Sequence, residues 1–408
     1  MGKIILHVDI NSYFATLLQQ ENPFLRDRPV GVVKDVGRTC IIAASKEAKK
    51  LGIKTGSNVA DAKILAPDIV LVPAEFDLYL DATRKLKRIF ESLAPEVSIY
   101  SLDEAFVDIS SCRDLYPDPI ELGYKIQKII KQVLGDWVTC NIGISHNRFL
   151  AKLASEISPK ESIFTIDKDN LDIVLAEAEF ADVCGIGLRL ERKLRMLNVF
   201  HPFQIRFYTD DDLLPLFGPF WSQELMKIAY GEEPYFLTLL DKNPHMKSVG
   251  RSITGRRVSC DEDSIKQVLY NLTEEVTYKV RQMDLCGRYV SIHLYGSGAT
   301  WRAHRTLKYY LRHTKEMFRI LYYDLYHKWK RHFPIIKFAV RLGQLVPINQ
   351  TSGSLLPDWQ QQERLYTAMD SISKKYGLFT VYSGLLHKKD IIRPEVTGFL
   401  GDKIYQLG

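Results

Sequence analysis

The sequence predicts a multidomain α+β protein, and three observations lead to this class. The chain has 408 residues, a length that corresponds to two or three domains rather than to one core. Residues 3–156 alternate short apolar strands with amphipathic helices around a hairpin. Residues 247–342 repeat a strand–helix rhythm, and residues 171–238 between them have mostly helical character.

The N-terminal part is predicted to form one sheet with helices on one of its faces. The expected elements, in order, are strands at 3–9, 30–33 and 39–43, helices at 45–51 and 79–93, strands at 96–100 and 105–109, a helix at 123–134, a strand at 138–145 and a helix at 147–156. Gly52 ends the first helix, and residues 101–104 connect two strands as a hairpin. This order is typical of an α+β layer.

From residue 171 onward the predicted secondary structure changes twice, first to short helices and then, after a linker, to a second pattern of strands and helices. Short helices are expected at 171–238 around the turn Cys184-Gly185-Ile186-Gly187, and Asp241-Lys242-Asn243-Pro244 has the composition of a linker. The following elements are expected as strand 247–256, helix 264–283, strands 288–295 and 300–309, helix 314–331 and strand 335–342. This β-α-β-β-α-β order predicts a four-stranded sheet with two helices on one side. A loop at 350–357 and a helix at 359–375 follow.

The two faces of this second sheet differ because side chains alternate along a strand. The residues expected to pack on the helices are Val290, Ile292, Leu294, Ile336, Phe338 and Val340. The residues expected on the free face are Tyr289, His293, Tyr295, Arg302, His304, Thr306, Lys308, Lys337 and Arg341. Residues 247–346 hold 19 Lys and Arg against 8 Asp and Glu, although the whole chain carries only +6. This localised charge favours a polyanionic partner over a generally soluble surface.

Several classes of protein are excluded by composition. No run of about 18 apolar residues occurs, so we expect no membrane span. Asp9 interrupts the N-terminal apolar run where a signal peptide would continue. The six cysteines are scattered without a Cys-x-x-Cys pair, which argues against a disulfide framework or a cysteine zinc site. We therefore expect a cytoplasmic protein.

Asp9 and the adjacent pair Asp103-Glu104 are candidate metal ligands. Each lies at a strand end or in a hairpin, in a segment otherwise built for a core. Adjacent like charges beside a buried sheet are costly unless a cation compensates them, and hard cations such as Mg²⁺ take carboxylate ligands. Two such ions about 4 Å apart activate one oxygen and neutralise a leaving pyrophosphate. The alternative is an ordinary acidic hairpin tip.

Five motifs in this chain resemble those of the Y-family translesion DNA polymerases of the DinB/UmuC type. They are Val8-Asp9-Ile10-Asn11-Ser12-Tyr13-Phe14-Ala15, Tyr100-Ser101-Leu102-Asp103-Glu104-Ala105-Phe106, Ile142-Gly143-Ile144-Ser145-His146-Asn147-Arg148-Phe149-Leu150-Ala151-Lys152-Leu153-Ala154-Ser155, Gly185-Ile186-Gly187 and Lys247-Ser248-Val249-Gly250. They occur in the family's order within residues 1–346. Each is weak alone, but together they identify the chain as a member of this family.

The resemblance implies a right-hand polymerase. It implies a palm at 1–20 and 74–166, fingers at 21–73, a thumb with a helix-hairpin-helix at 167–240, a little finger at 247–346 and a C-terminal tail at 347–408. The implied enzyme is a DNA-directed DNA polymerase, a nucleotidyltransferase acting in replication, DNA damage tolerance and repair. A primer 3′-hydroxyl would attack the α-phosphate of a dNTP opposite an undamaged or damaged template base.

The same resemblance implies the residues of the metal site. Asp9, Asp103 and Glu104 would be catalytic metal ligands, joined by the backbone carbonyl of Ile10. The cofactor would be two Mg²⁺ ions, with Mn²⁺ as a substitute. Metals supply the electrostatic stabilisation in this chemistry, so no side-chain nucleophile is required.

The nucleotide pocket implied by the resemblance departs from the family at several positions. Phe14 would be the steric gate against a 2′-hydroxyl with Tyr13 beside it, and core packing is the alternative for both. Lys46 and Lys49 replace a Tyr and an Arg that would meet the triphosphate, although Lys46 could instead project into solvent. Lys160 would serve the same triphosphate if its loop shifts.

Two departures accompany these residues. The family's Lys-Pro reads Ser158-Pro159-Lys160 here, so the lysine is displaced by one position. Cys40 and Ile42 align with the family's roof over the nascent base pair, which is usually small. Because Ile42 is bulky, we expect a narrower tolerance for large template adducts than in relatives with a small roof.

Primer-template DNA is the implied macromolecular partner. The amides around Gly185 and Gly187 would meet a DNA phosphate, with a plain helical hairpin as the alternative. Backbone phosphates would also be held by Arg256, Arg302, Lys308, Lys337 and Arg341. Residues 350–357 have the leucines of a sliding-clamp peptide without its closing aromatic, so the alternative is a linker. We expect a monomer without membrane contact.

Two rival interpretations remain open at this stage. A nucleotide cyclase would share a two-metal palm, but it needs neither the basic sheet nor the hairpin. A non-catalytic family member acting as a DNA-binding scaffold in damage tolerance would be marked by loss of an acid, and Asp9, Asp103 and Glu104 are all present.

Overall fold

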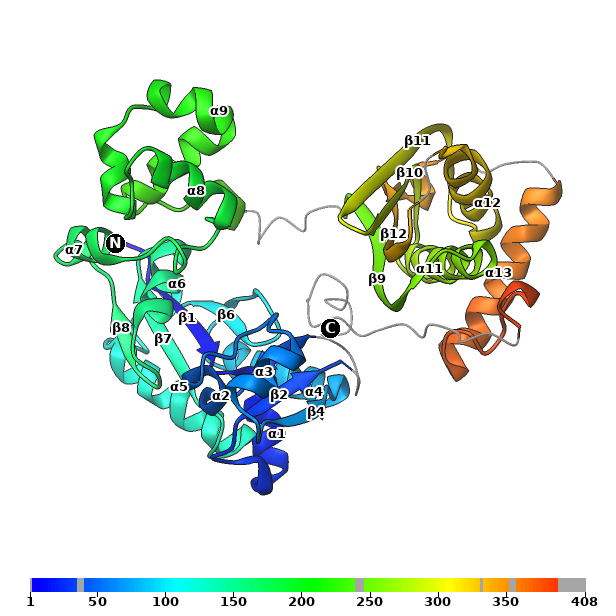
Figure 1. The fold of residues 1–408 in the computed structure, drawn as a ribbon. Coiled ribbons are helices and arrows are strands. Elements are labelled where there is room, and N and C mark those ends of the chain that lie inside the picture. The colour runs from blue at the N-terminus through cyan, green and yellow to red at the C-terminus, as the bar shows by residue number, and fades with distance from the viewer. Residues whose placement is uncertain (1, 35–39, 239–245, 331–332, 352–356, 388–408) are drawn as a thin grey trace. The chain divides into compact units, whose positions relative to one another are not determined.

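The chain divides into two compact units, Met1–Asn243 and Pro244–Val396 (Figure 1). The structure, a computed structural model, describes residues 2–34, 40–238, 246–330, 333–351 and 357–387, and the side chains of 256–258 and 357–358 are outside that description. Each unit contains its own buried apolar cluster, so each is described by itself. None of the described helices combines the length and apolar character that crossing a bilayer requires.

A five-stranded sheet forms the centre of the first unit, with strand order β5-β6-β1-β7-β8. Its strands are β1 (Ile5–Ile10), β5 (Glu96–Ile99), β6 (Glu104–Asp108), β7 (Cys140–Ser145) and β8 (Ile163–Thr165). The first four confirm predicted strands within two residues at each end, and β8 was not predicted. β1 lies in the middle of the order, paired antiparallel with both β6 and β7.

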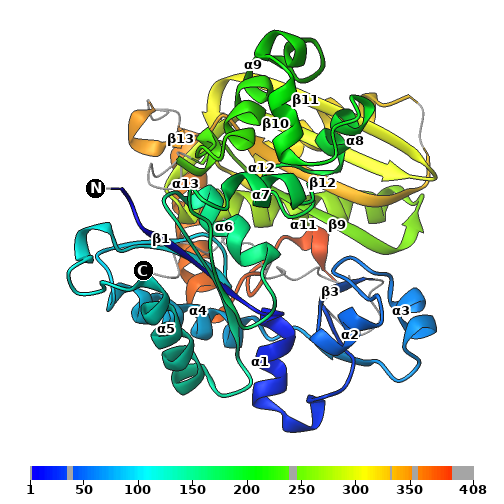
Figure 2. The same cartoon turned by 90° about the vertical axis from the view of Figure 1, so that its left-hand side faces the viewer.

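Helices cover both faces of this sheet, so the expectation of one covered face is wrong. α4 (Phe76–Glu91) and α5 (Pro119–Leu134) pack on one face, and α6 (Arg148–Ile157) packs against β1 and β7 on the other (Figure 2). In β1, Leu6 and Val8 join the first of these cores, while Ile5 packs with α6. The burial of these strands agrees with this arrangement, because every residue of β7 and every residue of β1 except Asp9 is buried.

A smaller sheet of order β3-β2-β4 lies in the same unit. Its elements and the helices around it are α1 (Tyr13–Glu21), β2 (Val30–Val33), β3 (Ile41–Ala44), α2 (Lys46–Lys50), α3 (Val59–Leu65) and β4 (Val70–Pro73). The Ser45 hydroxyl caps α2 by accepting from the Ala48 amide, so strand β3 passes directly into that helix. This junction determines where α2, the helix that carries the lysines, begins.

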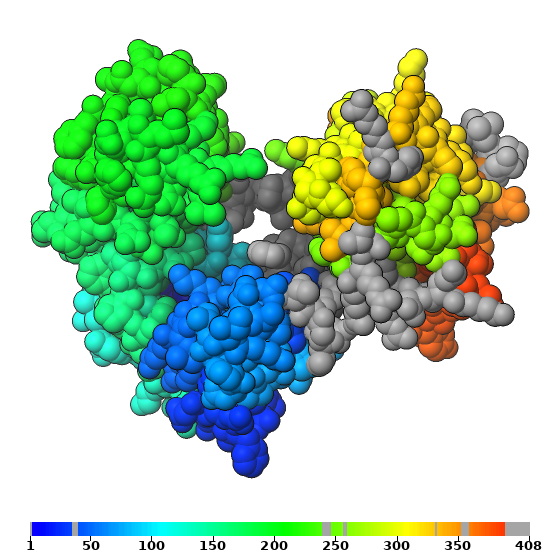
Figure 3. All heavy atoms as spheres, viewed as in Figure 1, coloured from blue at the N-terminus to red at the C-terminus, as the bar shows by residue number. Residues whose placement is uncertain are grey.

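The helical part of the first unit shares a core with α6. Its elements are α7 (Leu171–Glu177), α8 (Leu188–Met196), the 3₁₀ helix η3 (Pro202–Phe207), α9 (Asp210–Ala229) and α10 (Tyr235–Thr238), shown green in Figure 3. Their buried residues pack with Phe149, Leu150 and Leu153 of α6. α6 therefore connects the five-stranded sheet to the helical part.

The second unit is the predicted four-stranded sheet with helices on one side. Its strands are β9 (Ser248–Ser259), β10 (Leu285–Gly296), β11 (Ala299–Leu311) and β12 (Ile335–Gly343), in the order β11-β10-β12-β9, and a two-residue strand β13 (Val346–Pro347) pairs with β10. α11 (Glu262–Gln282) and α12 (Thr314–Arg319) cover one face. The predicted helix at 314–331 continues beyond α12 as a π turn, Ile320–Leu325, and a 3₁₀ turn, Tyr326–Lys328.

The predicted core face of this sheet is confirmed except at one position. Val290, Ile292, Leu294, Phe338 and Val340 are buried. Ile336 is only half-buried, and its neighbour Ile335 is 1% exposed and belongs to the core. The alternation slips here because the pairing of β12 with β9 shifts register between Ile335 and Lys337.

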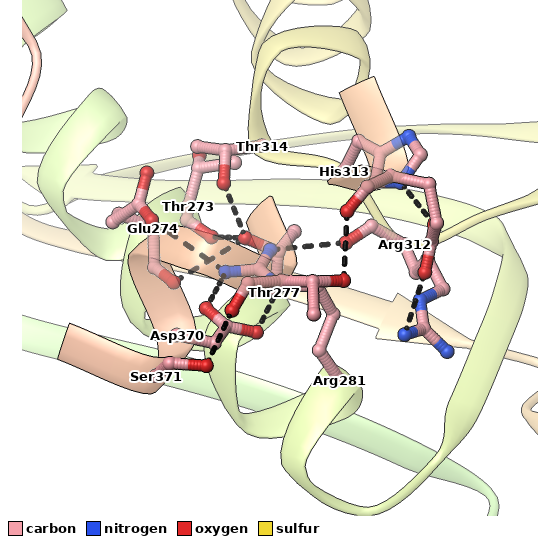
Figure 4. A network of polar contacts seen from close by, with 11 residues as sticks. Thr273, Glu274, Thr277, Arg281, Arg312, His313, Thr314, Asp370 and Ser371 are labelled. Atoms are coloured by element: carbon pink, nitrogen blue, oxygen red, sulfur yellow. Dashed lines mark hydrogen bonds and ion pairs between the residues drawn. The ribbon is translucent and has the colours of Figure 1, made fainter. Parts of the chain in front are cut away.

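The predicted tail helix is α13 (Pro357–Tyr376), and it docks on the helices of the second unit (Figure 4). Arg281 of α11 donates from Nε and Nη2 to the two carboxylate oxygens of Asp370, at 2.8 and 2.9 Å. Glu363 accepts from Arg312 at 2.9 Å and contacts His313 Nε2 at 2.6 Å. The guanidinium of Arg281 is almost fully buried, which makes α13 an integral part of this unit.

Candidate active site

Asp9 and Glu104 face each other across neighbouring strands of the five-stranded sheet. The antiparallel pairing of β1 with β6 makes them direct partners. The Ile10 amide donates to the Asp103 carbonyl at 3.0 Å, which ties the hairpin to the end of β1. This register brings the three predicted acids to one end of the central strand.

A further carboxylate, Glu156 of α6, reaches the same place. Carboxylate oxygens of Asp9, Glu104 and Glu156 lie within 4.8 Å of one another. Asp103 is not in this group, and its carboxylate accepts a hydrogen bond from the Ser101 hydroxyl. The structure thus joins two of the three predicted acids to one that the sequence reasoning missed. The available signal was Glu156 itself, the last residue of the predicted helix at 147–156.

The acids of this site differ in charge. Burial, with Asp103 nearby, raises the pKa of Asp9 to about 8, and burial also raises the pKa of Asp103. Burial opposes the charge of Glu104 too, but a hydrogen bond from His7 and the ammonium of Lys152 outweigh it and lower the pKa to about 2. The Asp9 carboxylate has no hydrogen-bond partner among the described residues. Such an uncompensated acid among hard oxygen donors fits a divalent cation.

Two buried side chains contact Glu104, and neither was predicted to be a site residue. The Lys152 ammonium contacts Glu104 Oε2 and lies 3.4 Å from Glu156 Oε1. Burial opposes its charge, but the two carboxylates raise the pKa of Lys152 above its usual range. His7 is fully buried with Nε2 3.0 Å from Glu104 Oε2, and burial lowers the pKa of His7, so its ring is neutral.

The two predicted aromatic residues of α1 are placed differently. The Phe14 ring is half-buried and stacks on Tyr79 at 4.3 Å, with Phe76 edge-on at 6.2 Å. Tyr13 is 3% exposed, and its hydroxyl is within 2.8 Å of both the Tyr79 carbonyl and the Thr83 hydroxyl. A ring this buried has almost no surface to offer a nucleotide, so the structure favours the core alternative for Tyr13. Phe14 packs against the same core but keeps part of its ring exposed.

The predicted lysines fall into two groups. Burial and the neighbouring Lys160 ammonium lower the pKa of Lys49, while Asp9 and Asp103 act on it in the opposite direction. Lys49 therefore lies within electrostatic range of Lys160 and of the acids. Lys46 points elsewhere, with its ammonium 4.3 Å from the ring centre of Trp137. Ile42 is half-buried on β3 and packs against the core of the sheet.

The glycine turn ahead of α8 has the geometry of an open helix start. Gly185 has φ of +89°, and a Cβ there would lie 2.5 Å from Phe236, so both conformation and space require glycine. Gly187 caps α8, and nothing lies within 4 Å of a Cβ built on it. No neighbouring atom therefore occupies the space where a Gly187 side chain would stand, at the helix N-terminus, the end of a helix that can bind an anion.

The free face of the second sheet carries the predicted basic residues. The exposed ones are Arg302, Lys308, Lys337 and Arg341. Strand pairing places Arg302 opposite His293, and burial together with Arg302 and Lys337 lowers the pKa of His293. The side chain of Arg256 lies outside the described residues, as do residues 352–356 of the segment predicted to bind a clamp.

Comparison with known proteins gives the same assignment over both units. The impB/mucB/samB family matches residues 8–156, and the C-terminal domain of that family matches residues 246–355. The fold is similar to a Y-family DNA polymerase chimera, Dbh-Dpo4(243-245)-Dbh, with a TM-score of 0.72 and 23% sequence identity, covering 84% of this chain and 99% of that one.

Acids at the end of a central strand, lysines beside them and a separate basic sheet define a right-hand polymerase. DNA polymerase IV of Moorella thermoacetica is 30% identical, covering 91% of this chain and 93% of its own length, and that of Pelotomaculum thermopropionicum is 29% identical, covering 91% and 92%. The chain belongs to the impB/mucB/samB family and is a Y-family, DinB-type DNA polymerase. The members of this class are DNA-directed, translesion-type enzymes.

Proposed function

We propose that Asp9, Asp103 and Glu104, with the Ile10 carbonyl, hold two Mg²⁺ ions for dNTP addition to a primer 3′-hydroxyl. The observation that carries this proposal is the pairing of Asp9 with Glu104 in one acidic group, in which the Asp9 carboxylate has no hydrogen-bond partner among the described residues. Bound there, the ions supply the positive charge that activates the hydroxyl and neutralises the pyrophosphate. Mn²⁺ is accepted by the same oxygen donors. Glu156 competes with Asp103 for the place of third carboxylate.

The nucleotide occupies the space between the acids and α2. Phe14, held at its stacking angle by Tyr79, lies below the sugar and excludes a 2′-hydroxyl. Lys49 and Lys160 bind the triphosphate, and the proximity of Lys49 to Lys160 and to the acids supports this role. A lysine binds phosphate as a point charge, without the bidentate fork of arginine. Ile42 forms the roof and narrows the tolerance for bulky template adducts.

Primer-template DNA is bound through its backbone phosphates, without sequence-specific contacts to its bases. The amides at Gly185 and Gly187 meet one phosphate, and Arg302, Lys308 and Lys337 meet others across the free sheet face. Arg256 and Arg341 extend the same basic row. We assign the palm to residues 1–20 and 74–166, the fingers to 21–73, the thumb to 167–240 and the little finger to 247–346, with a tail from 347.

Extension of a primed template with four dNTPs and Mg²⁺ tests the metal assignment. An Asp103→Ala/Glu104→Ala variant should bind the template but lose extension, and Glu156→Gln tested alone shows whether that acid also matters. Extension by the double variant would contradict the assignment. A folded wild type that binds DNA without extending it would favour a non-catalytic scaffold.

A sliding clamp is proposed as a further partner through residues 350–357. The leucines of this segment support binding, and the missing aromatic predicts weak affinity. A Leu355→Ala/Leu356→Ala variant should lose clamp-stimulated processivity while keeping distributive extension. We further propose that the enzyme works as a cytoplasmic monomer, which sedimentation of the purified chain tests in part.

A further inference from the structure

His7 lies in the middle of β1 with no exposed surface, two residues before Asp9. Its ring packs beside Phe106, with ring centroids 4.7 Å apart. A polar ring at the centre of a buried strand is retained at a desolvation cost, so its two nitrogens need partners. Both have one, because Nδ1 lies 2.7 Å from the Ser155 hydroxyl and Nε2 lies 3.0 Å from Glu104 Oε2.

The direction of these two hydrogen bonds follows from the carboxylate. An ionised Glu104 only accepts, so Nε2 of the neutral ring donates to it. Nδ1 is then an acceptor facing the Ser155 hydroxyl, whose single proton it shares with the Lys152 carbonyl 2.8 Å from the same oxygen. The chain Ser155–His7–Glu104 therefore runs from α6 through β1 to β6, and each member comes from an element packed in the core.

Both donors to Glu104 use the same oxygen. The Lys152 ammonium contacts Oε2, as His7 does, whereas Oε1 has no hydrogen-bond partner among the described residues. Because two donors hold one oxygen of the carboxylate, the rotation of the carboxylate is restricted. The other oxygen therefore keeps one orientation. Asp9, the direct strand partner of Glu104, shares the acidic group with it.

We propose that His7 is a positioning residue that, braced by Ser155, presents Glu104 Oε1 to a divalent cation and thereby sets the affinity of the site for metal. This inference rests on the proposed function, because it takes Glu104 as a ligand. Loss of an outer partner of a ligand typically weakens metal binding by about 10–100-fold. Lys152 by itself leaves the carboxylate free to pivot about a flexible side chain, and a ring fixed at both nitrogens prevents that rotation.

The test uses the full-length protein with primer-template DNA terminated by a dideoxynucleotide, and a dNTP. His7→Phe keeps the shape of the ring and removes both hydrogen bonds, while His7→Gln restores an amide donor near the position of Nε2. Ser155→Ala removes the contact to His7 Nδ1 together with the hydrogen bond from the same hydroxyl to the Lys152 carbonyl. Phe106→Leu is the matched control, because it changes packing against the same ring without touching a hydrogen bond. Bound Mn²⁺ is measured by electron paramagnetic resonance, and the Mg²⁺ concentration for half-maximal extension is measured separately with an unblocked primer.

His7→Phe should weaken Mn²⁺ binding about 10–100-fold and raise the half-maximal Mg²⁺ concentration, with extension recovering at saturating Mg²⁺. His7→Gln should recover part of the affinity, and Ser155→Ala should show a smaller loss. Mn²⁺ affinity within twofold of wild type in a folded His7→Phe, or an equal loss in Phe106→Leu, overturns the proposal. If His7→Phe does not fold, an unchanged affinity in Ser155→Ala overturns it instead.

Failure of the underlying function is distinguishable from failure of this inference. In the first case Glu104→Gln leaves Mn²⁺ affinity unchanged, which removes Glu104 as a ligand and overturns both. In the second case Glu104→Gln loses affinity while the His7 variants do not.

Discussion

Asp9 and Glu104 are direct partners across β1 and β6, yet the structure shifts their pKa values in opposite directions, to about 8 and about 2. Both carboxyl groups are affected by burial. The difference arises because His7 and Lys152 donate to Glu104, whereas Asp9 has other acids as its neighbours. Glu104 is ionised before a cation binds, whereas Asp9 becomes fully ionised near neutral pH only when a cation binds.

Metal affinity should therefore depend on pH through Asp9. Below its pKa of about 8, binding must displace a proton, so affinity should rise about tenfold per pH unit and level off above that value. Mn²⁺ titrations of the DNA complex between pH 6 and pH 9 measure this dependence. In Asp9→Asn the residual affinity should lose most of the slope, and an unchanged slope would contradict the assignment.

The same shift predicts an effect on the metal-free protein. The pKa of Asp9 is higher in the folded than in the unfolded chain, so its contribution to stability is lost as pH rises from about 4 to about 8. Asp9→Asn removes this cost and should raise the melting temperature by about 2–4 °C at pH 8 for each kcal/mol recovered. Near pH 4 the variant and the wild type should melt alike in differential scanning calorimetry.

Lys49 should contribute to dNTP binding and its neighbour Lys50 should not. Both lysines are exposed on the same short helix, and Lys49 lies within electrostatic range of Lys160 and the acids. Lys49→Ala should raise the KM for dNTP about tenfold, equivalent to about 1.4 kcal/mol, and Lys49→Arg should retain most binding. Steady-state single-nucleotide insertion measures both, with Lys50→Ala as the control. Equal effects at the two positions would show that only general charge matters.

Phe14 should control sugar selection. Its ring is held against Tyr79, so replacing it by alanine opens space for a 2′-hydroxyl. Phe14→Ala should insert ribonucleotides at least tenfold more efficiently relative to deoxyribonucleotides. Leu17→Ala, one turn further along α1 and 3% exposed, is the control that perturbs the same helix. Its discrimination should match wild type despite lower stability, and a change as large as that of Phe14→Ala would contradict the gate.

The docked tail helix should stabilise the second unit. Asp370→Asn removes the nearer carboxylate from the buried Arg281 and leaves Glu274, 3.7 Å away, so the cost should stay below the value of about 3 kcal/mol for a fully unpaired buried charge. Asp324→Asn breaks the more exposed pair with Arg305 and should cost about 0–1 kcal/mol. Calorimetry of the full chain compares the two variants. Equal melting temperatures would mean that α13 contributes little to this fold.

The basic sheet face should make DNA affinity salt-dependent. Removing one phosphate contact lowers the slope of log affinity against log salt by about one. Arg302→Ala and Lys337→Ala should each do this, while Lys375→Ala on α13 should leave the slope unchanged. Fluorescence anisotropy over a range of NaCl concentrations measures the slopes. A steep slope retained in both sheet variants would exclude this face from the DNA contact.

Local signals account for what could be predicted from the sequence. The strand at Val30–Val33 has the predicted bounds, since a short apolar run between polar segments is a local pattern. The helix at 79–93 was found by its apolar spacing, although it begins at Phe76. Ile336 shows the limit of such patterns, because one bulge shifts the inward positions and nothing in the local alternation marks it.

By itself, the sequence determined the class of fold, the motif acids Asp9, Asp103 and Glu104, the concentration of positive charge in one part of the chain, and many of the strands and helices, although α1, α3, β4 and β8 were not predicted. Only the tertiary structure decided that α6 covers the second face of the sheet and brings Glu156 and Lys152 to Glu104. The reason is that motifs and periodicity are properties of neighbouring residues. The environment of a carboxylate depends on which distant elements pack around it and on how far they exclude water.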